Sequence, residues 1–590
     1  MAGVSSSTSM ADPRVGIAAL VGRPLALISA LLLLAIAPAA SAGDERGATA
    51  LGGAEVRIGA MTVRGELDAA SRVVAFRGIP FARPPIDERR WRKPEPLPTR
   101  VGVLEATQFA PACMQSGSGL AWYQDLMRRI GEDPTQFPAP AYSEDCLYLN
   151  VWSDLSDTTL RPVIVYIHGG SNTGGWSYEP NYRGQALAER GVVLVSVAYR
   201  LGVFGFLSHP DLSDRNFALH DLAMALHWVR DHIEAFGGDP TRITLMGESA
   251  GAANASHLMV SPLSQGIATR LIHQSGGWQF DAIADPALAL ELGSRLETAV
   301  VGQEGGLPAL RRASAAAVLE AAGDVYSDFY FSPVPDQASL PATLGELAAM
   351  DALPAFDLLI GTNADEALMY IGDDATTVDW LSEHYSGREG AIRAQLDDAA
   401  KDHHSLNMLR TAEHFACPSA RLASAVAAAG GRSYVYEFLR VRDGLDAIGA
   451  YHGAELPYVF ATHDDWLPTG DTDRRLTEQM VARWLSFAAH GQPDDGMDPP
   501  WPLWQAESQQ ILFLGDEVAT GTFSYVDLCP VLTVPCHQAA VRLHQGAVSR
   551  PGEERGAATC AIRLVESLDG ASAITGNTKH RPRHGSKRHS

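Results

Sequence analysis

Residues 242–259 read Arg-Ile-Thr-Leu-Met-Gly-Glu-Ser-Ala-Gly-Ala-Ala-Asn-Ala-Ser-His-Leu-Met, with Ser249 at the centre of a G-x-S-x-G motif that spans 247–251. A short apolar strand runs directly into the motif, and a stretch able to form a helix follows it. The small residues allow a sharp turn that lifts the serine hydroxyl clear of the backbone. The helix N-terminus then points at the place where negative charge would develop. The alternative is an ordinary glycine-rich turn, but this context favours a nucleophile elbow at Ser249.

Outward from this motif, strand and helix signals alternate. Apolar residues at spacings of three and four predict a helix over 217–236, and Gly237-Gly238 can end it. Short apolar runs predict strands over 161–167, 192–198, 356–360 and 433–438. A further helix is expected over 472–490. The alternation predicts an α/β fold with a mostly parallel sheet and helices on both faces. The alanine-rich stretch 286–353 is expected to form helical walls over the catalytic edge.

Size, composition and charge set broad limits. The chain has 590 residues, of which 46% are hydrophobic and 19% are charged, enough for a large core. Length alone suggests about four domains, although large α/β enzymes often form one unit. The net charge of −23 argues against nucleic acid or an anionic membrane surface as the main partner.

The N-terminus has the pattern of a secretory signal. Arg14 and Arg23 precede an apolar run over 25–36, and Ala40-Ser41-Ala42 fits a cleavage site, so we expect residues 1–42 to be a signal peptide. An uncleaved anchor is the alternative, and translation could begin at Met1 or Met10. No other segment is apolar enough to span a membrane. We therefore expect a periplasmic or secreted protein. Residues 546–590, with a basic tail over 579–589, are expected to be a largely disordered extension.

Six cysteines occur, and none forms a C-x-x-C pair with zinc-like spacing, so no structural zinc site is expected. Export favours disulfides. Spacing alone does not choose among the pairings of four of them, which are Cys417, Cys529, Cys536 and Cys560.

A serine nucleophile needs a base, an acid that orients the base, and donors for the oxyanion. The acid candidates are Asp365 and Glu366, which follow the strand expected over 356–360; only one of the two can face the base. His452 is the base candidate because it lies among small, loop-forming residues after both the serine and the acid. The order Ser…Asp/Glu…His is that of α/β-hydrolases.

The oxyanion donors are expected from backbone N–H groups. The loop 168–172, which reads His-Gly-Gly-Ser-Asn, follows a strand and can aim its amides inward. The N–H of Ala250, directly after the nucleophile, supplies a second arm. Such a site requires no metal and no organic cofactor.

Several segments together resemble the type B carboxylesterase/cholinesterase family. Besides the elbow, they are Glu-Asp-Cys-Leu-Tyr-Leu-Asn-Val at 144–151, His-Gly-Ala-Glu-Leu-Pro-Tyr at 452–458, Phe-Arg-Gly-Ile-Pro-Phe-Ala at 76–82, Tyr-Arg-Leu-Gly at 199–202 and Gln-Ser-Gly at 274–276. They occur in the family's order, so we expect one catalytic domain over residues 52–540. The resemblance implies an α/β-hydrolase fold with the active site at the foot of a gorge.

The resemblance also assigns roles to individual residues. It implies that Glu366 is the triad acid and that Cys113 and Cys146 form a disulfide. It places the oxyanion amides on Gly170, Ser171 and Ala250. Ser275 matches a serine that supports the triad, and Glu248 is the acidic neighbour of the nucleophile.

The chain departs from the family pattern at a few positions. Ser171 and Asn172 stand where a small residue and an aromatic are usual, Leu222 replaces Gln, and Ala367 replaces Gly. The loop between Cys113 and Cys146 has no Trp where cholinesterases hold choline, since Trp122 lies elsewhere in it; a quaternary-ammonium substrate is therefore poorly supported.

The expected activity is hydrolysis of a small-molecule carboxylic ester by Ser249, His452 and Glu366 through an acyl-enzyme. A lipase, a carbamate hydrolase or an amide hydrolase could use the same triad, and a non-catalytic binding protein on the same fold is a remote alternative. Four aromatic residues could line the pocket or pack in the core: Trp176, Phe204, Phe206 and Trp278. Oligomeric state and physiological substrate do not follow from the sequence.

Overall fold

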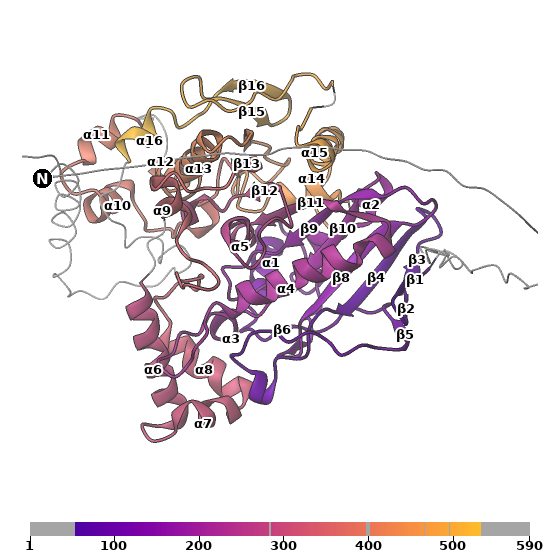
Figure 1. Cartoon of the computed structure of the whole chain (residues 1–590). Coiled ribbons are helices and arrows are strands. Elements are labelled where there is room, and N and C mark those ends of the chain that lie inside the picture. The colour runs from indigo at the N-terminus through magenta and orange to yellow at the C-terminus, as the bar shows by residue number, and fades with distance from the viewer. Residues whose placement is uncertain (1–53, 282–284, 397–401, 465, 495, 533–590) are drawn as a thin grey trace, which may run out of the picture. The chain divides into compact units, whose positions relative to one another are not determined.

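The computed structural model describes residues 54–281, 285–396, 402–464, 466–494 and 496–532. Their main element is a sheet of eleven strands in the order β16-β15-β14-β13-β12-β11-β9-β10-β8-β4-β3 (Figure 1). The bounds of these strands are β3 (Glu66–Leu67), β4 (Val73–Pro80), β8 (Tyr148–Asp154), β9 (Arg161–Ile167), β10 (Val193–Val197), β11 (Gly238–Glu248), β12 (Arg270–Gln274), β13 (Asp357–Asn363), β14 (Ser433–Phe438), β15 (Gln510–Leu514) and β16 (Val518–Thr522).

The centre of this sheet is parallel and its ends are antiparallel. Every neighbouring pair from β10 through β9, β11, β12, β13 and β14 to β15 is parallel, whereas β8, β4, β3 and β16 pair with their neighbours antiparallel. Two small sheets stand beside it, formed by β1 (Glu55–Ile58), β2 (Met61–Arg64) and β5 (Gly102–Glu105), and by β6 (Ala112–Cys113) and β7 (Tyr142–Ser143).

Parallel neighbours need crossover connections, and helices supply most of them. The helices are α1 (Ser118–Arg129), α2 (Gln185–Glu189), α3 (Gly202–Phe206), α4 (Phe217–His232), α5 (Ala250–Val260), α6 (Pro286–Val301), α7 (Gly306–Arg312), α8 (Ala315–Val325), α9 (Leu344–Ala349), α10 (Thr377–His384), α11 (Glu389–Arg393), α12 (Asp402–Thr411), α13 (Cys417–Ala428), α14 (Leu456–Phe460), α15 (Asp471–His490) and α16 (Leu528–Val531).

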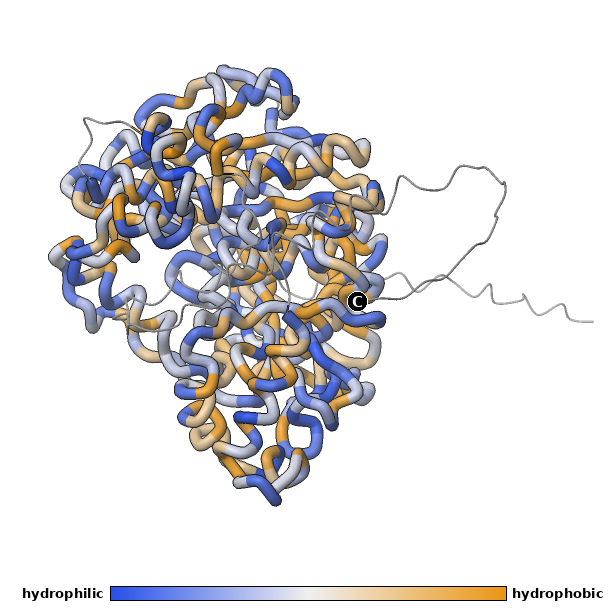
Figure 2. Tube along the Cα trace, turned by 90° about the vertical axis from the view of Figure 1, so that its left-hand side faces the viewer, coloured by the Kyte–Doolittle hydropathy of each residue, from blue (hydrophilic) through white to orange (hydrophobic). Residues whose placement is uncertain are grey.

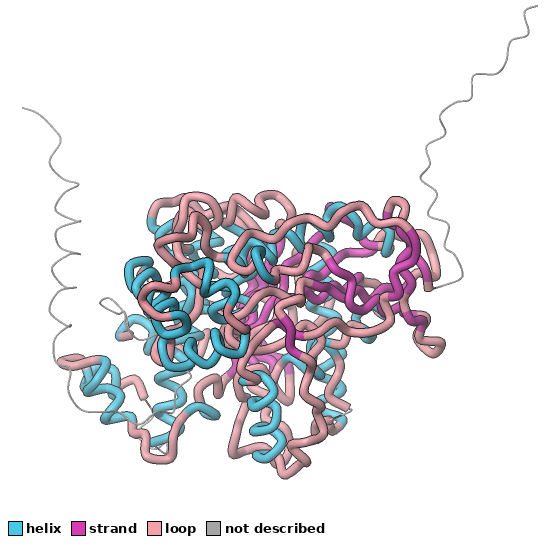
Figure 3. Tube along the Cα trace, turned by 90° about the horizontal axis from the view of Figure 1, so that it is seen from below, coloured by secondary structure: helices cyan, strands magenta, loops and turns pink. Residues whose placement is uncertain are grey.

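Both faces of the sheet are covered. In β9, Val163 and Val165 pack into one core with α4 and α5, while Ile164 and Tyr166 pack into a second core with α14 and α15. Figure 3 shows the strands running together with helices on either side of them, and Figure 2 shows much of the hydrophobic chain in the interior. Burial on both faces explains the continuous apolar runs of these strands. The expected α/β architecture is confirmed.

Most of the expected elements occur within a few residues of their predicted bounds. Strands 161–167 and 433–438 match β9 and β14, and the helix 472–490 matches α15. The helix expected over 217–236 ends earlier, since α4 stops at His232 and the chain continues as a 3-10 turn that Gly237 closes at a φ of 76°. The stretch 286–353 contains α6, α7, α8 and α9, as expected for a helical insertion.

Two disulfides link the described residues. Cys113 is bonded to Cys146, and Cys417 is bonded to Cys529. No helix of the described part is both long and apolar enough to cross a membrane. The expected signal peptide at 1–42, both start codons, Cys536, Cys560 and the extension over 546–590 lie outside the described residues.

Candidate active site

The G-x-S-x-G segment forms a sharp turn between a strand and a helix. β11 ends at Glu248, α5 begins at Ala250, and Ser249 between them has a φ of 56° and a ψ of −129°. Residues other than glycine rarely adopt this backbone conformation, and such strain is most often found at functional sites. The Ser249 N–H donates to the carbonyl of Gln274 at 2.8 Å, which ties the turn to β12. The serine is therefore held in the geometry of a nucleophile elbow.

The two glycines of the motif are required by packing. A Cβ on Gly251 would lie 2.0 Å from the carbonyl oxygen of Ile167, and one on Gly247 would lie 2.4 Å from the backbone of Gly251. A side chain on Gly251 would force the turn away from the end of β9, and one on Gly247 would clash with the first turn of α5. The glycines thus let the nucleophile turn sit against the loop that follows β9.

Glu366 and His452, the expected acid and base, lie in direct contact. Oε2 of Glu366 lies 2.6 Å from Nδ1 of His452, and Oε1 of Glu366 accepts the N–H of Asn363 at 2.8 Å. Glu366 is fully buried just after β13. A buried carboxylate at this nitrogen fixes both the orientation and the tautomer of the imidazole.

Asp365 has a different task. Its carboxylate accepts the N–H of Ala450 at 2.8 Å and the side-chain amide of Asn407 at 2.8 Å. The N–H of Asp365 also donates to the carbonyl of Ala450 at 3.0 Å. Asp365 therefore holds the loop that carries His452, and its neighbour Glu366 contacts the imidazole.

The other imidazole nitrogen faces a second carboxylate. Nε2 of His452 lies 3.3 Å from Oε1 of Glu248, and no hydrogen bond joins it to Ser249 Oγ among the described residues. Ser249 and His452 nevertheless line the same cavity. A nitrogen that is to accept the serine proton must be free of Glu248, so this contact competes with proton transfer.

Burial and charge act in opposite directions on this pair. Burial alone would lower the pKa of His452, but the carboxylates of Glu248 and Glu366 raise it to about 9. Burial raises the pKa of Glu248 to about 8, and His452 opposes that rise. Each group therefore favours the charged form of the other.

The oxyanion loop packs directly against the nucleophile. A Cβ on Gly169 would lie 2.9 Å from the Cβ of Ser249. Gly170 and Ser171 have φ values of 94° and 55°, and neither their N–H groups nor that of Ala250 donate a hydrogen bond to another described residue. Three backbone donors are thus available beside the serine, as an oxyanion hole requires.

Asn172, which departs from the family pattern, anchors this loop. Its side chain donates to the carbonyl of Phe331 at 2.8 Å and accepts from Asn254 at 2.7 Å. It is 1% exposed and does not line the cavity. These hydrogen bonds satisfy the buried amide, which explains how a polar side chain is accommodated at this position.

The supporting role expected of Ser275 has no contact behind it. Its hydroxyl is fully buried and has no hydrogen-bond partner in the part of the chain that the structure describes, although its N–H donates to the carbonyl of Gly361 at 2.9 Å. Asn363 instead joins Glu366 to a buried network: its N–H donates to Glu366, and its side-chain amide donates to Oε2 of Glu455 at 2.6 Å, while Gln274 donates to Oε1 of Glu455 at 2.8 Å. Sequence reasoning missed this network, although Glu455 lies in the quoted 452–458 segment.

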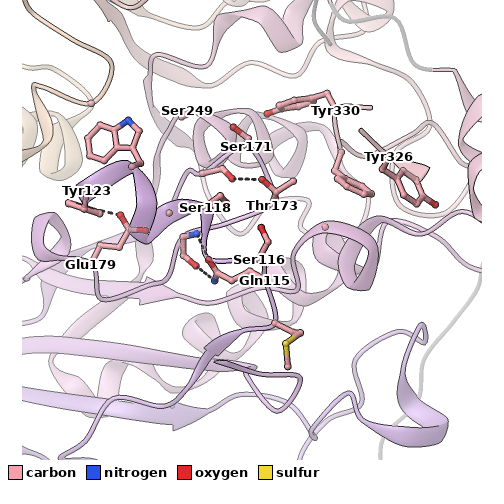
Figure 4. Close-up of a pocket in the computed structure, with 18 of the residues that line it drawn as sticks. Gln115, Ser116, Ser118, Tyr123, Ser171, Thr173, Glu179, Ser249, Tyr326 and Tyr330 are labelled. Carbon is pink, nitrogen blue, oxygen red and sulfur yellow. Dashed lines mark hydrogen bonds between the residues drawn. The ribbon is translucent and has the colours of Figure 1, made fainter. Parts of the chain in front are cut away.

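A cavity of about 490 Å³ opens beside Ser249, and Figure 4 shows part of its lining. Aromatic side chains make up much of the wall; they are Trp122, Tyr123, Tyr182, Tyr326, Phe329, Tyr330, Phe331 and Tyr370. α8 contributes to this wall, as expected of the helical insertion. Of the aromatic residues that the sequence left open, none lines the cavity; Trp176, Phe204, Phe206 and Trp278 are buried in the protein.

One cluster among the described residues has the composition of a metal site: His209, Asp211 and Glu297. The protein already satisfies its imidazole, because Nδ1 of His209 accepts the N–H of Asp211 at 3.1 Å and Nε2 lies 2.8 Å from Glu297. None of the three lines the cavity.

The fold and this site are those of a serine hydrolase of the α/β-hydrolase class, and the chain belongs to the carboxylesterase family, whose sequence model matches residues 54–525. It is an enzyme that acts on carboxylic ester bonds. It is 32% identical to a fumonisin B1 esterase of Sphingopyxis macrogoltabida over 500 residues, 76% of this chain and 84% of that protein. It is 31% identical to a para-nitrobenzyl esterase of Bacillus subtilis over 469 residues, 75% of this chain and 91% of that protein.

Solved structures agree with these relatives. A thermophilic para-nitrobenzyl esterase matches with a TM-score of 0.71 at 28% identity, covering 81% of this chain and 99% of that one. A carboxylesterase of Geobacillus stearothermophilus matches with a TM-score of 0.70 at 28% identity, covering 81% of this chain and all of that one (100%). The expected fold and family are confirmed.

Proposed function

We propose that Ser249, His452 and Glu366 form the catalytic triad of this esterase. The observation that carries the proposal is the 2.6 Å contact between Nδ1 of His452 and Glu366, beside a strained serine turn. Neutral Nε2 accepts the serine proton while Oγ bonds to the ester carbonyl carbon. The oxyanion is held by the N–H groups of the 170–171 turn and of Ala250.

The tetrahedral adduct then collapses. The bond from carbon to the alcohol oxygen breaks, His452 returns its proton to the departing alcohol, and the acyl group remains on Ser249. Water attacks the acyl-enzyme with the same imidazole as base, and the carboxylic acid leaves. The Glu366 carboxylate at Nδ1 stabilises the imidazolium.

The test is Ser249→Ala, which should abolish hydrolysis of p-nitrophenyl butyrate while the circular dichroism spectrum and melting temperature stay near those of the wild type. A fluorophosphonate probe should label the wild type at Ser249 and leave the variant unlabelled, because only an activated serine reacts. Hydrolysis that survives in the folded variant would overturn the triad. A wild type that resists the probe and hydrolyses no ester would favour a binding protein.

We also propose that the protein is exported. The signal-like segment at 1–42 and the two disulfides of the described residues support an oxidising compartment. N-terminal sequencing of the protein recovered from the periplasm or medium should begin at Gly43. A chain that keeps its first residues inside the cell would contradict export.

A further inference from the structure

A single π turn interrupts the helical segment that follows the acid loop. α12 ends at Thr411, the π turn η6 (Ala412–Ala416) comes next, and α13 begins at Cys417; α12 and α13 are labelled in Figure 1. A π turn takes up one more residue than a turn of α-helix, and such turns are frequent at functional sites. The irregular turn in an otherwise regular segment therefore requires an explanation.

Asn407, on α12, holds the acid loop. Its side-chain amide donates to the carboxylate of Asp365 at 2.8 Å, and its side-chain oxygen accepts the N–H of Ala367 at 3.2 Å. Glu366 lies between these two residues in the chain. Asn407 therefore fixes the backbone on both sides of the expected acid.

Phe415, in the π turn, lies against the imidazole. The ring centroids of Phe415 and His452 are 5.2 Å apart and their planes are inclined by 52°, which is the geometry of a packed aromatic pair. Phe415 also stands edge-on to Trp278 at 5.4 Å, and a Cβ on Gly277 would lie only 2.6 Å from its carbonyl oxygen. It is buried and does not line the cavity. The protein itself therefore holds this ring in place.

The π turn puts these two contacts on one side of the segment. Phe415 lies eight residues after Asn407, and successive residues of an α-helix are about 100° apart around the axis. A regular helix would place Phe415 about 80° away from Asn407, whereas the residue taken up by the π turn reduces this offset to about 20°. The turn thus lets one segment face both the acid loop and the imidazole.

A single hydrogen bond does not orient an imidazole. Glu366 contacts Nδ1 of His452, but the terminal torsion of a histidine side chain has broad energy wells, so the ring can turn about this contact. Nε2 lies 3.3 Å from Glu248 and has to be directed to Ser249 during the reaction. A ring packed on the imidazole restricts such turning, and a small displacement of a catalytic group is costly.

We propose that Phe415, which the π turn over 412–416 presents to the imidazole, is a positioning residue for His452. Phe415 does not reach the substrate cavity, so it acts through the imidazole alone. The inference rests on the proposed function, because it takes His452 as the base toward Ser249 and as the acid toward the departing alcohol. A misplaced imidazole transfers protons less efficiently, and the loss is greatest for an alcohol that leaves poorly as an anion.

Two butyrate esters with different leaving groups test the proposal. p-Nitrophenol leaves readily as an anion, whereas ethanol needs the proton from His452 as its bond to carbon breaks. Phe415→Ala should lower kcat/KM by about 10-fold for p-nitrophenyl butyrate and by about 100-fold for ethyl butyrate. Phe415→Leu, which keeps most of the apolar volume, should recover most of both losses. Rates are expressed per serine titrated with a fluorophosphonate, so unfolded protein does not contribute.

Phe236→Ala is the matched control. Phe236 is fully buried, packs edge-on against Phe76 with centroids 4.9 Å apart, and precedes β11, at the opposite end of that strand from Ser249. The control should lower the melting temperature and leave the ratio of the two rates unchanged. If Phe415→Ala does not fold, Phe415→Val gives the same comparison.

A wild-type ratio in the folded Phe415 variants, or the same change of ratio in Phe236→Ala, would overturn the role of Phe415. Cleavage of both esters by the wild type and its loss in Ser249→Ala keep these outcomes separate from a failure of the triad.

Discussion

The contact between His452 and Glu248 makes a prediction about pH. A carboxylate 3.3 Å from Nε2 stabilises the imidazolium, and Coulomb's law at an effective dielectric constant of about 20 gives about 5 kcal/mol for unit charges at that separation. Because Glu248 is itself incompletely ionised and the site can relax, we expect a smaller effect, about 1–3 units in the pKa of His452. Glu248→Gln should therefore lower that pKa. Glu366 and Glu455, which also raise it, remain in place.

The sign of the effect follows from the mechanism. The active form has a neutral imidazole, so kcat/KM rises with pH through the pKa of His452 in the free enzyme. In Glu248→Gln the acid limb of the profile should move to lower pH by about 1–3 units. The profile is measured with p-nitrophenyl butyrate, and the apparent pKa is read rather than the plateau, because the substitution can also alter the maximal rate.

Glu179→Gln is the control for this experiment. Glu179 is another buried carboxylate of the cavity, but its oxygens accept from Trp176 N–H at 2.9 Å and from Tyr123 O–H at 2.9 Å and do not contact His452. Its acid limb should move much less. An unchanged limb in Glu248→Gln, a move to higher pH, or equal shifts in both variants would refute the competition between Glu248 and Ser249 for the imidazole.

Further substitutions probe the acid, the turn and the second disulfide. Glu366→Gln should lower kcat by about 10³- to 10⁴-fold. Asp365→Asn should lower the melting temperature and leave kcat much closer to that of the wild type. A larger loss of kcat in Asp365→Asn than in Glu366→Gln would exchange the two roles. A Cβ on Gly251 would lie 2.0 Å from a main-chain oxygen, so Gly251→Ala should yield little folded protein by circular dichroism, and a normal yield with full activity would contradict this packing. The Cys417–Cys529 disulfide spans 112 residues, so replacing both cysteines by alanine should lower the unfolding free energy by about 4–5 kcal/mol in urea titrations; an unchanged midpoint would argue against the link.

The parts of the site that could be predicted from sequence are those set by local chain geometry. The turn at Ser249 lies between a strand and a helix that are contiguous with it, so residues 242–259 contain nearly all the information needed. The small residues of the 168–172 loop likewise mark a turn within a few positions. The strands 161–167 and 433–438 are buried on both faces, which gives them a strong apolar signal.

What the sequence left open depends on contacts between distant segments. The local sequence does not show whether Asp365 or Glu366 contacts the imidazole. That depends on Ala450 and Asn407, which donate hydrogen bonds to the Asp365 carboxylate, so that Glu366 is the one that contacts His452. The partner of Cys417 lies 112 residues away. The sequence pattern around an aromatic residue is the same in a pocket wall as in a core. For this reason the sequence does not decide whether Trp176 lines the pocket, and it does not identify Trp122 as part of the wall.

The Cys113–Cys146 bridge has a consequence for where the enzyme can work well. It closes the excursion that carries α1, and α1 brings Trp122 and Tyr123 to the substrate chamber, whereas Ser249, Glu366 and His452 all lie outside that excursion. A thiol reductant should therefore reduce the difference in kcat/KM between large substrates before it lowers the rate of cleavage of a small ester. The first bridge therefore links substrate selectivity to the redox state of the surroundings, whereas the second, Cys417–Cys529, links the stability of the whole domain to that redox state.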